Sequence, residues 1–143
     1  MSSGSSATTR STDVAAVYLD ASAIVKLIVD EPESAALVAS LHPDARHVTS
    51  RIATVEVMRA AARHGGVDVG RVLAVLDALD MIELNEDVAT RAGSIAPTDL
   101  RALDAIHLAS AIGIRRELTS FIAYDERLAA AARVHVLPVE SPV

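Results

Sequence analysis

The chain of 143 residues has no cysteine, a single lysine and very few aromatic side chains. Without cysteine there is no disulfide framework, no thiolate metal site and no cysteine nucleophile. Aromatic residues make up 2% of the chain and hydrophobic residues 51%, so the core must be filled by Ala, Val, Leu and Ile. A site for a hard cation with oxygen ligands remains open.

The sequence also lacks a long hydrophobic run. No apolar stretch reaches the roughly 18 residues that a membrane-spanning helix needs. Residues 1–13 are polar, rich in Ser and Thr, and without the apolar region of a signal peptide. We therefore expect a disordered N-terminal tail over 1–13, one domain over 14–143, and a cytoplasmic protein with no membrane association.

The net charge of -6 argues against non-specific coating of nucleic acid, because such binding depends on many phosphate contacts from Lys and Arg. It does not exclude a nuclease, which needs only a local basic rim. Twelve of the 13 cationic residues are Arg, the better bidentate partner for phosphate.

Short apolar runs of strand type alternate with helical patterns along the chain. The expected strands cover residues 16–19, 47–49, 81–84, 121–124 and 135–138. This alternation predicts an α/β fold with a central parallel sheet of about four to five short strands and helices on both faces. In such a sheet the functional crevice lies outside the carboxyl ends of the strands, where the strand order reverses.

Four carboxylates lie beside or inside apolar runs, where an unpaired negative charge is costly to desolvate. Asp20 and Asp125 each follow an expected strand, Glu56 falls in the second turn of a helix, and Asp104 falls in the early turns of another. All four can reach one rim of the sheet. Because like charges at close range raise one another's pKa, a divalent cation is the expected compensation.

Mg²⁺ or Mn²⁺ suits such a set of oxygen ligands. A bound ion of this kind can lower the pKa of an attacking water and stabilise charge on a leaving oxygen. The matching chemistry is hydrolysis of a nucleic-acid backbone.

The segments YLDASAIVKL, the helix around Glu56, LDAIHLASA and YDERLAAAA resemble, in order and spacing, the four acidic motifs of PIN-domain ribonucleases. The likeness is greatest to the VapC-like toxins of type II toxin–antitoxin pairs. It covers the chain beyond the tail, and its most specific parts are the first and third motifs.

The resemblance implies an endoribonuclease dependent on Mg²⁺ or Mn²⁺. Such an enzyme acts as the toxin of the pair, is held inactive by a bound antitoxin protein, and forms a homodimer or a toxin–antitoxin hetero-oligomer. Asp20, Glu56, Asp104 and Asp125 take the place of the metal-binding and catalytic acids, with Ser22 as a supporting hydroxyl. The chain departs from the family at Ala123, where Thr or Ser is common, so Asp125 ranks below the other three acids.

Each residue also has an ordinary structural interpretation. Asp20 and Asp125 can simply cap the helices that follow them, and Glu56 can pair with an arginine on its own helix. We expect His107 to be a core histidine hydrogen-bonded to a carboxylate or to the backbone, and leave it out of the catalytic set. Among the arginines, Arg101 is one of the two that matter most, because it lies on the helix that carries Asp104.

Two other functions remain open. A PIN-fold module of weak activity could bind an antitoxin or RNA without cleavage. A phospho-acceptor receiver domain is a second acidic α/β module, but it needs an acidic pair after its first strand and a late lysine, whereas the only lysine here is Lys26.

The helices expected over 51–63 and 68–80 have more Ala and Val than one buried face requires. In the first of them, apolar spacing predicts a buried face made of Ile52, Val55, Met58 and Ala62. The excess suggests a surface that faces a partner, either a second copy of the chain or an antitoxin helix.

Overall fold

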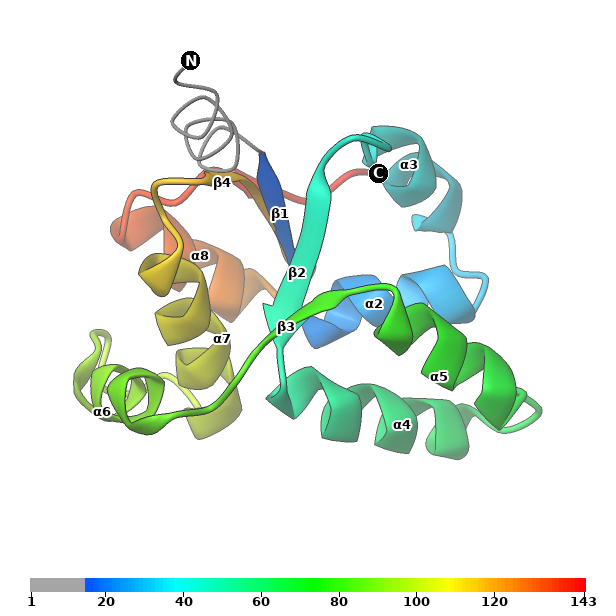
Figure 1. Cartoon of the computed structure of the whole chain (residues 1–143), viewed down its shortest axis with the longest axis horizontal. Helices are drawn as coiled ribbons and strands as arrows, with labels where there is room; N and C mark the ends of the chain where they lie inside the picture. The colour runs from blue at the N-terminus through cyan, green and yellow to red at the C-terminus, as the bar shows by residue number, and fades with distance from the viewer. Residues whose placement is uncertain (1–14) are drawn as a thin grey trace, which may run out of the picture.

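A computed structural model describes residues 15–143, and these form a five-stranded sheet in which every strand pair is parallel. The strand order is β3-β2-β1-β4-β5 (Figure 1). The strands are β1 (Ala16–Leu19), β2 (Arg46–Ser50), β3 (Asp80–Ile82), β4 (Leu118–Ile122) and β5 (Val139–Glu140). The predicted tail over 1–13 lies outside the described residues.

Helices cover both faces of this sheet, as the alternation of elements predicts (Figure 1). One face is covered by α2 (Ala21–Ile28), α3 (Ser34–Ser40), α4 (Ile52–His64) and α5 (Val69–Asp77). On the other face lie α7 (Ala102–Gly113) and α8 (Glu126–Val134), and α6 (Glu86–Ser94) packs against α7. The α/β prediction is confirmed.

Alternation along β1 divides the core into two parts, because successive side chains of a strand point to opposite faces. Val17 and Leu19 are buried in the cluster with α2 to α5, whereas Ala16 and Tyr18 are buried in the cluster with α7 and α8. Tyr18 stacks on Phe121 with ring centroids 5.2 Å apart. Two of the few aromatic rings therefore lie together beneath α7.

The chain adds strands outward from β1 through β2 to β3 and then returns to place β4 on the other side of β1. The strand order thus reverses between β1 and β4. In an open parallel sheet, binding sites form at this point, outside the carboxyl ends of the strands. The residues that follow β1 and β4 therefore lie where a binding site is expected.

The predicted buried face of α4 is wrong. The structure buries the small residues Ala53, Val57 and Ala61, while Val55 and Met58 are exposed. Helix α4 packs against α2, and small side chains at that contact let the two backbones approach closely. Apolar size alone therefore indicated the wrong face.

The closing strand also differs from the prediction over 135–138. Helix α8 continues to Val134, and Val136 has a positive φ of 62°, which an extended strand cannot contain. The strand therefore begins later, at Val139. None of the helices within residues 15–143 has the length and apolar character needed to cross a membrane.

Candidate functional site

Asp20 lies directly after β1 and caps the N-terminus of α2. Its Oδ1 accepts a hydrogen bond from the backbone N–H of Ala23 at 2.9 Å and another from the hydroxyl of Ser22 at 2.6 Å. The residue is only 3% exposed. Burial raises the pKa of the Asp20 carboxyl, and the charge of Glu56 raises it further. The fold thus holds an acid where its ionised form is costly.

Asp125 occupies the equivalent place after β4, at the N-terminus of α8. Its Oδ1 accepts from the backbone N–H of Leu128 at 3.0 Å, which leaves Oδ2 to face Arg101. Asp104 lies in the first turn of α7. Three of the acids therefore lie at helix N-termini, where the helix dipole favours negative charge. Capping by Asp20 and Asp125 is compatible with a role in a site, because a carboxylate has two oxygens and the cap uses one of them.

The guanidinium of Arg101 bridges two of the predicted acids. Its Nε donates to Asp104 Oδ2 at 3.2 Å, and its Nη2 donates to Asp125 Oδ2 at 3.3 Å. The side chain of Arg101 is 65% exposed and that of Asp104 13% exposed. An exposed surface cation thus compensates two acids that the fold has placed together.

Glu56 contacts neither of the arginines of its own helix that the sequence offers as partners. Its Oε1 lies 2.6 Å from Nε2 of His107, and Nδ1 of the same ring lies 2.7 Å from the hydroxyl of Tyr18. Both Tyr18 and His107 are almost fully buried. Burial raises the pKa of the Tyr18 hydroxyl, with a further rise from the charge of Asp20. The expectation of a core histidine bonded to a carboxylate is confirmed.

Ser22 connects the first acid to the loop that carries the fourth. Its Oγ donates to Asp20 and accepts from the backbone N–H of Tyr124 at 3.1 Å. Ala123, at the position where the family commonly has a hydroxyl, is buried in the core. Contacts therefore run from Asp20 through Ser22 to the backbone of Tyr124, the residue before Asp125, at the edge that β1 and β4 share.

Electrostatic and bonded contacts link all four acids to this edge. Asp20 senses the charge of Glu56, and Arg101 joins Asp104 to Asp125. Within residues 15–143, however, no three His, Asp or Glu side chains lie close enough together to hold a metal ion as they stand. The structure brings the acids to one rim without closing them around a common centre.

The donor set nevertheless fits a hard cation. All four candidates offer carboxylate oxygens, Asp20 is a buried acid that lacks a cationic partner among the described residues, and Arg101 stands in as a cation between two others. Movement of that exposed arginine would free two oxygens for a metal ion. The residues that could hold the ion are Asp20, Glu56, Asp104 and Asp125.

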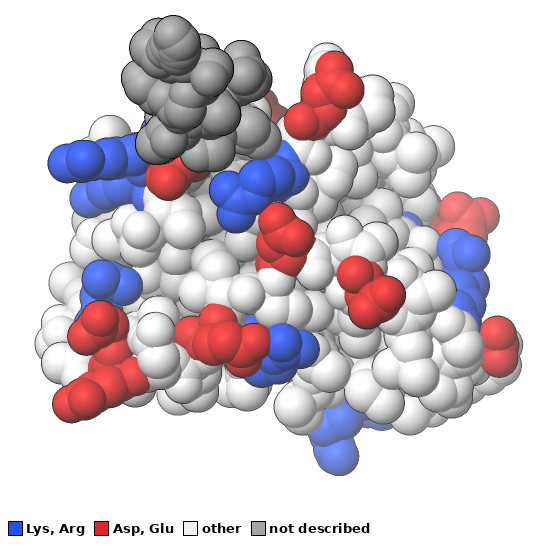
Figure 2. Space-filling model, viewed as in Figure 1, with Lys and Arg blue, Asp and Glu red and all other residues white. Residues whose placement is uncertain are grey.

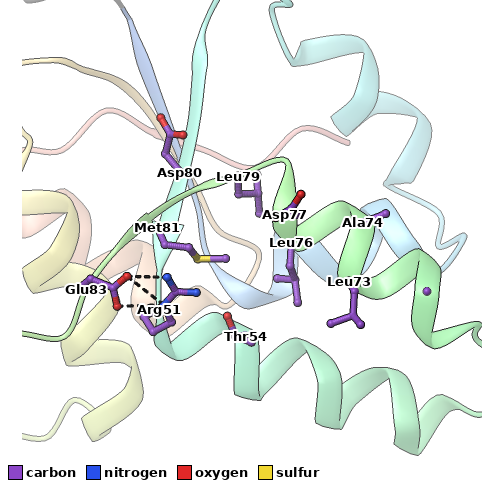
Figure 3. Close-up of a pocket in the computed structure, with 11 residues that line it drawn as sticks. Arg51, Thr54, Leu73, Ala74, Leu76, Asp77, Leu79, Asp80, Met81 and Glu83 are labelled. Carbon is purple, nitrogen blue, oxygen red and sulfur yellow. Dashed lines mark hydrogen bonds and ion pairs between the residues drawn. The ribbon is translucent and has the colours of Figure 1, made fainter.

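A sizeable hollow in the described part of the chain lies elsewhere. It has a volume of about 730 Å³ and lies between α4, α5 and β3 (Figure 3). Leu73 and Leu76 line it from α5, and Arg51 and Glu83 form an ion pair at its rim. None of the four acids contributes to its wall.

Comparison with known proteins agrees with this arrangement. The sequence pattern of the PIN domain matches residues 17–134. The chain belongs to the PIN-domain family. This PIN domain is 43% identical over 122 residues to ribonuclease VapC47 of Mycobacterium tuberculosis (strain CDC 1551 / Oshkosh), covering 82% of the chain and 90% of the relative. It is 41% identical over 129 residues to ribonuclease VapC46 of M. tuberculosis (strain ATCC 25618 / H37Rv), covering 90% of the chain and 99% of the relative.

Solved structures share the fold of this PIN domain. A toxin–antitoxin complex from Klebsiella pneumoniae superimposes with a TM-score of 0.68 at 22% identity, covering 89% of this chain and 98% of that chain. M. tuberculosis VapC20, a toxin that cleaves the sarcin–ricin loop, gives 0.64 at 18% identity, with coverages of 85% and 99%. The PIN assignment replaces the receiver-domain alternative. The position of Lys26 also argues against a receiver domain, because its amino group contacts Glu31 and Glu33 rather than the four acids.

Proposed function

We propose that this PIN domain is an endoribonuclease that acts as the toxin of a toxin–antitoxin pair and requires Mg²⁺ or Mn²⁺. The observation that carries the proposal is the set of four acids at the carboxyl edge of β1 and β4, in a chain whose relatives are VapC ribonucleases. PIN-domain ribonucleases generally use divalent metal ions. The module that binds without cleaving is not favoured.

In this proposal the chain's own residues have distinct tasks. Asp20, Glu56, Asp104 and Asp125 hold the cation, and Ser22 fixes the orientation of Asp20 through their 2.6 Å hydrogen bond. A bound divalent ion would supply positive charge at the scissile phosphate and acidify the attacking water. The helix N-termini at three of the acids limit the repulsion among them before the ion binds.

Substrate binding in this proposal depends on local cations rather than on the charge of the whole surface. On the face shown in Figure 2, Lys and Arg side chains alternate with Asp and Glu and do not form one basic surface. Arg101 lies beside two of the acids and is exposed. Once a metal ion replaces it there, its guanidinium is free to bind an RNA phosphate.

The antitoxin is proposed to bind the exposed apolar side chains of α4 and α5. Val55 and Met58 lie on α4, and Val69 and Leu73 on α5, and between 40% and 60% of each is exposed. Leu73 also lines the large hollow between these helices (Figure 3). Apolar side chains concentrated in this way favour a partner-facing surface. A second copy of the chain is the alternative occupant.

A cleavage assay on the antitoxin-free protein tests the proposal. We expect RNA cleavage with Mg²⁺ or Mn²⁺, loss of cleavage with a chelator, and recovery when the ion is restored. Asp20→Asn and Asp104→Asn should each abolish cleavage, while Asp77→Asn, which removes an acid on α5 away from the site, should not. Cleavage that survives the chelator or both site variants would contradict the proposal.

A further inference from the structure

A chain of hydrogen bonds that starts in the protein core holds the side chain of Glu56. It begins at the hydroxyl of Tyr18 on β1, passes through the ring of His107 on α7, and ends at Oε1 of Glu56 on α4. The two bonds are short, at 2.7 and 2.6 Å, and His107 is only 1% exposed. Three elements that are distant in sequence are thus connected through one imidazole.

The partners of the imidazole fix which nitrogen carries its proton. An ionised carboxylate can only accept, so Nε2 carries the hydrogen that is donated to Glu56. The Tyr18 hydroxyl lies 2.7 Å from His107 Nδ1, with the hydroxyls of Thr49 and Ser110 also close to it. In a neutral ring that carries its hydrogen on Nε2, Nδ1 is the acceptor, and the phenol donates its hydrogen to it.

Packing holds the first member of the chain in place. The ring of Tyr18 stacks on Phe121 with an interplanar angle of 6° and meets the ring of His107 edge-on at 82°. His107 cannot rotate without breaking a buried hydrogen bond at each nitrogen. Glu56 is held at Oε1, and its Oε2 makes no hydrogen bond within residues 15–143.

We propose that His107 is a positioning residue that orients Glu56 toward the cation, and that Tyr18 selects the imidazole tautomer required for this. The inference rests on the proposed function, since Glu56 is one of the four acids assigned there. Partners that orient a metal ligand in this way typically contribute about 10- to 100-fold in metal affinity or activity. His107 needs no contact with RNA or metal to do so.

Mn²⁺ titration of the full chain in the absence of RNA tests the proposal. His107→Leu should weaken Mn²⁺ binding by about 10- to 100-fold. His107→Gln can still donate from its amide to Glu56 and should recover most of the affinity. Leu108→Val is the matched control, because it loosens the same buried helix without touching the hydrogen-bond chain and should bind Mn²⁺ like the wild type.

Three outcomes of the titration would overturn the proposal: wild-type affinity in His107→Leu, equal loss in His107→Gln, or equal loss in Leu108→Val. If His107→Leu fails to fold, Tyr18→Phe replaces it. That variant keeps the stacked ring and loses only the hydroxyl, so Mn²⁺ binding should weaken. Wild-type affinity in Tyr18→Phe would remove the role assigned to Tyr18.

The tautomer can be observed without metal or activity. Nitrogen NMR of the metal-free wild type should show His107 protonated at Nε2 alone, and Tyr18→Phe should reduce that preference. A ring protonated at Nδ1, or at both nitrogens, would overturn the inference. Because this measurement requires no catalysis, a protein that fails to cut RNA would contradict the proposed function and still leave the tautomer to be tested.

Discussion

Asp20→Asn separates the structural role of this side chain from its proposed chemical role. The variant keeps an Oδ1 atom that can accept from the Ala23 N–H and from the Ser22 hydroxyl, and Asn caps helices as well as Asp does. It removes only the buried negative charge. We expect RNA cleavage to be lost and the metal-free protein to become more stable than the wild type at neutral pH.

A comparison with Asp20→Ala gives the contribution of the helix cap to stability. Alanine also removes the charge, but it loses the cap, which is worth about 0.5–2 kcal/mol. Asp20→Asn should therefore be more stable than Asp20→Ala by about 0.5–2 kcal/mol. In a domain of this size, each kcal/mol corresponds to roughly 4 °C in Tm.

The stability difference between Asp20→Asn and the wild type should depend on pH in a defined direction. Burial raises the pKa of Asp20 in the folded state, so the folded protein holds this proton to higher pH than the unfolded chain does. The contribution of Asp20 to wild-type stability is fully present below the unfolded pKa of about 3.9. It is lost as the pH rises through the raised pKa of the folded state. The advantage of Asp20→Asn should be largest at neutral pH and shrink toward acid.

Denaturant unfolding with a chelator present, repeated over a pH series, measures these differences. Adding Mn²⁺ should reverse the order, since an ion that binds the folded wild type stabilises it by about 2.7 kcal/mol at 100 times its Kd. The reasoning fails if Asp20→Asn is the less stable protein at neutral pH without metal. It fails equally if the difference between the two proteins does not change with pH.

Three further predictions concern the contacts around the acids and the partner surface. Arg101→Ala should tighten Mn²⁺ binding in calorimetry, because it removes a cation that competes for Asp104 and Asp125. Arg51→Ala breaks an ion pair away from the acids and should leave Mn²⁺ binding unchanged. Weaker Mn²⁺ binding in Arg101→Ala would contradict the proposal that Arg101 takes the place of the metal ion. Ser22→Ala should lower the free energy of unfolding by about 1–2 kcal/mol, because it breaks two hydrogen bonds, and should also slow cleavage; a loss of stability with unchanged cleavage would limit Ser22 to the fold. Leu73→Arg should weaken antitoxin binding in a pull-down while RNA cleavage by the free protein continues, and undiminished binding would place the partner elsewhere.

Local pattern was enough to predict the sheet and two of the acids. Side chains alternate along β1, and a residue that follows a parallel strand must lie at the carboxyl edge. The positions of Asp20 and Asp125 follow from these two rules. The helix cap at Asp125 could be predicted in the same way, because the capping oxygen and the backbone N–H that donates to it lie within one turn.

Contacts between distant segments could not be predicted from the sequence. Glu56 and His107 are 51 residues apart, and neither helix alone indicates that their faces meet. Arg101 was singled out for its position on the helix of Asp104, but its bridge to Asp125 depends on how α7 and α8 pack. The buried face of α4 was predicted wrongly because close packing against α2 favours Ala53 over the larger Val55. The signal that could have pointed to Tyr18 is its place two residues before Asp20, on the same strand face.

Anomalous scattering from a crystal of the antitoxin-free protein soaked in Mn²⁺ tests the central claim most directly. The account predicts a manganese peak at the carboxyl edge of β1 and β4, within bonding distance of Asp20 and at least one of the other three acids, with the Arg101 guanidinium turned away from Asp104. Saturating Mn²⁺ that gives no peak there, or that leaves Arg101 between Asp104 and Asp125, would contradict it.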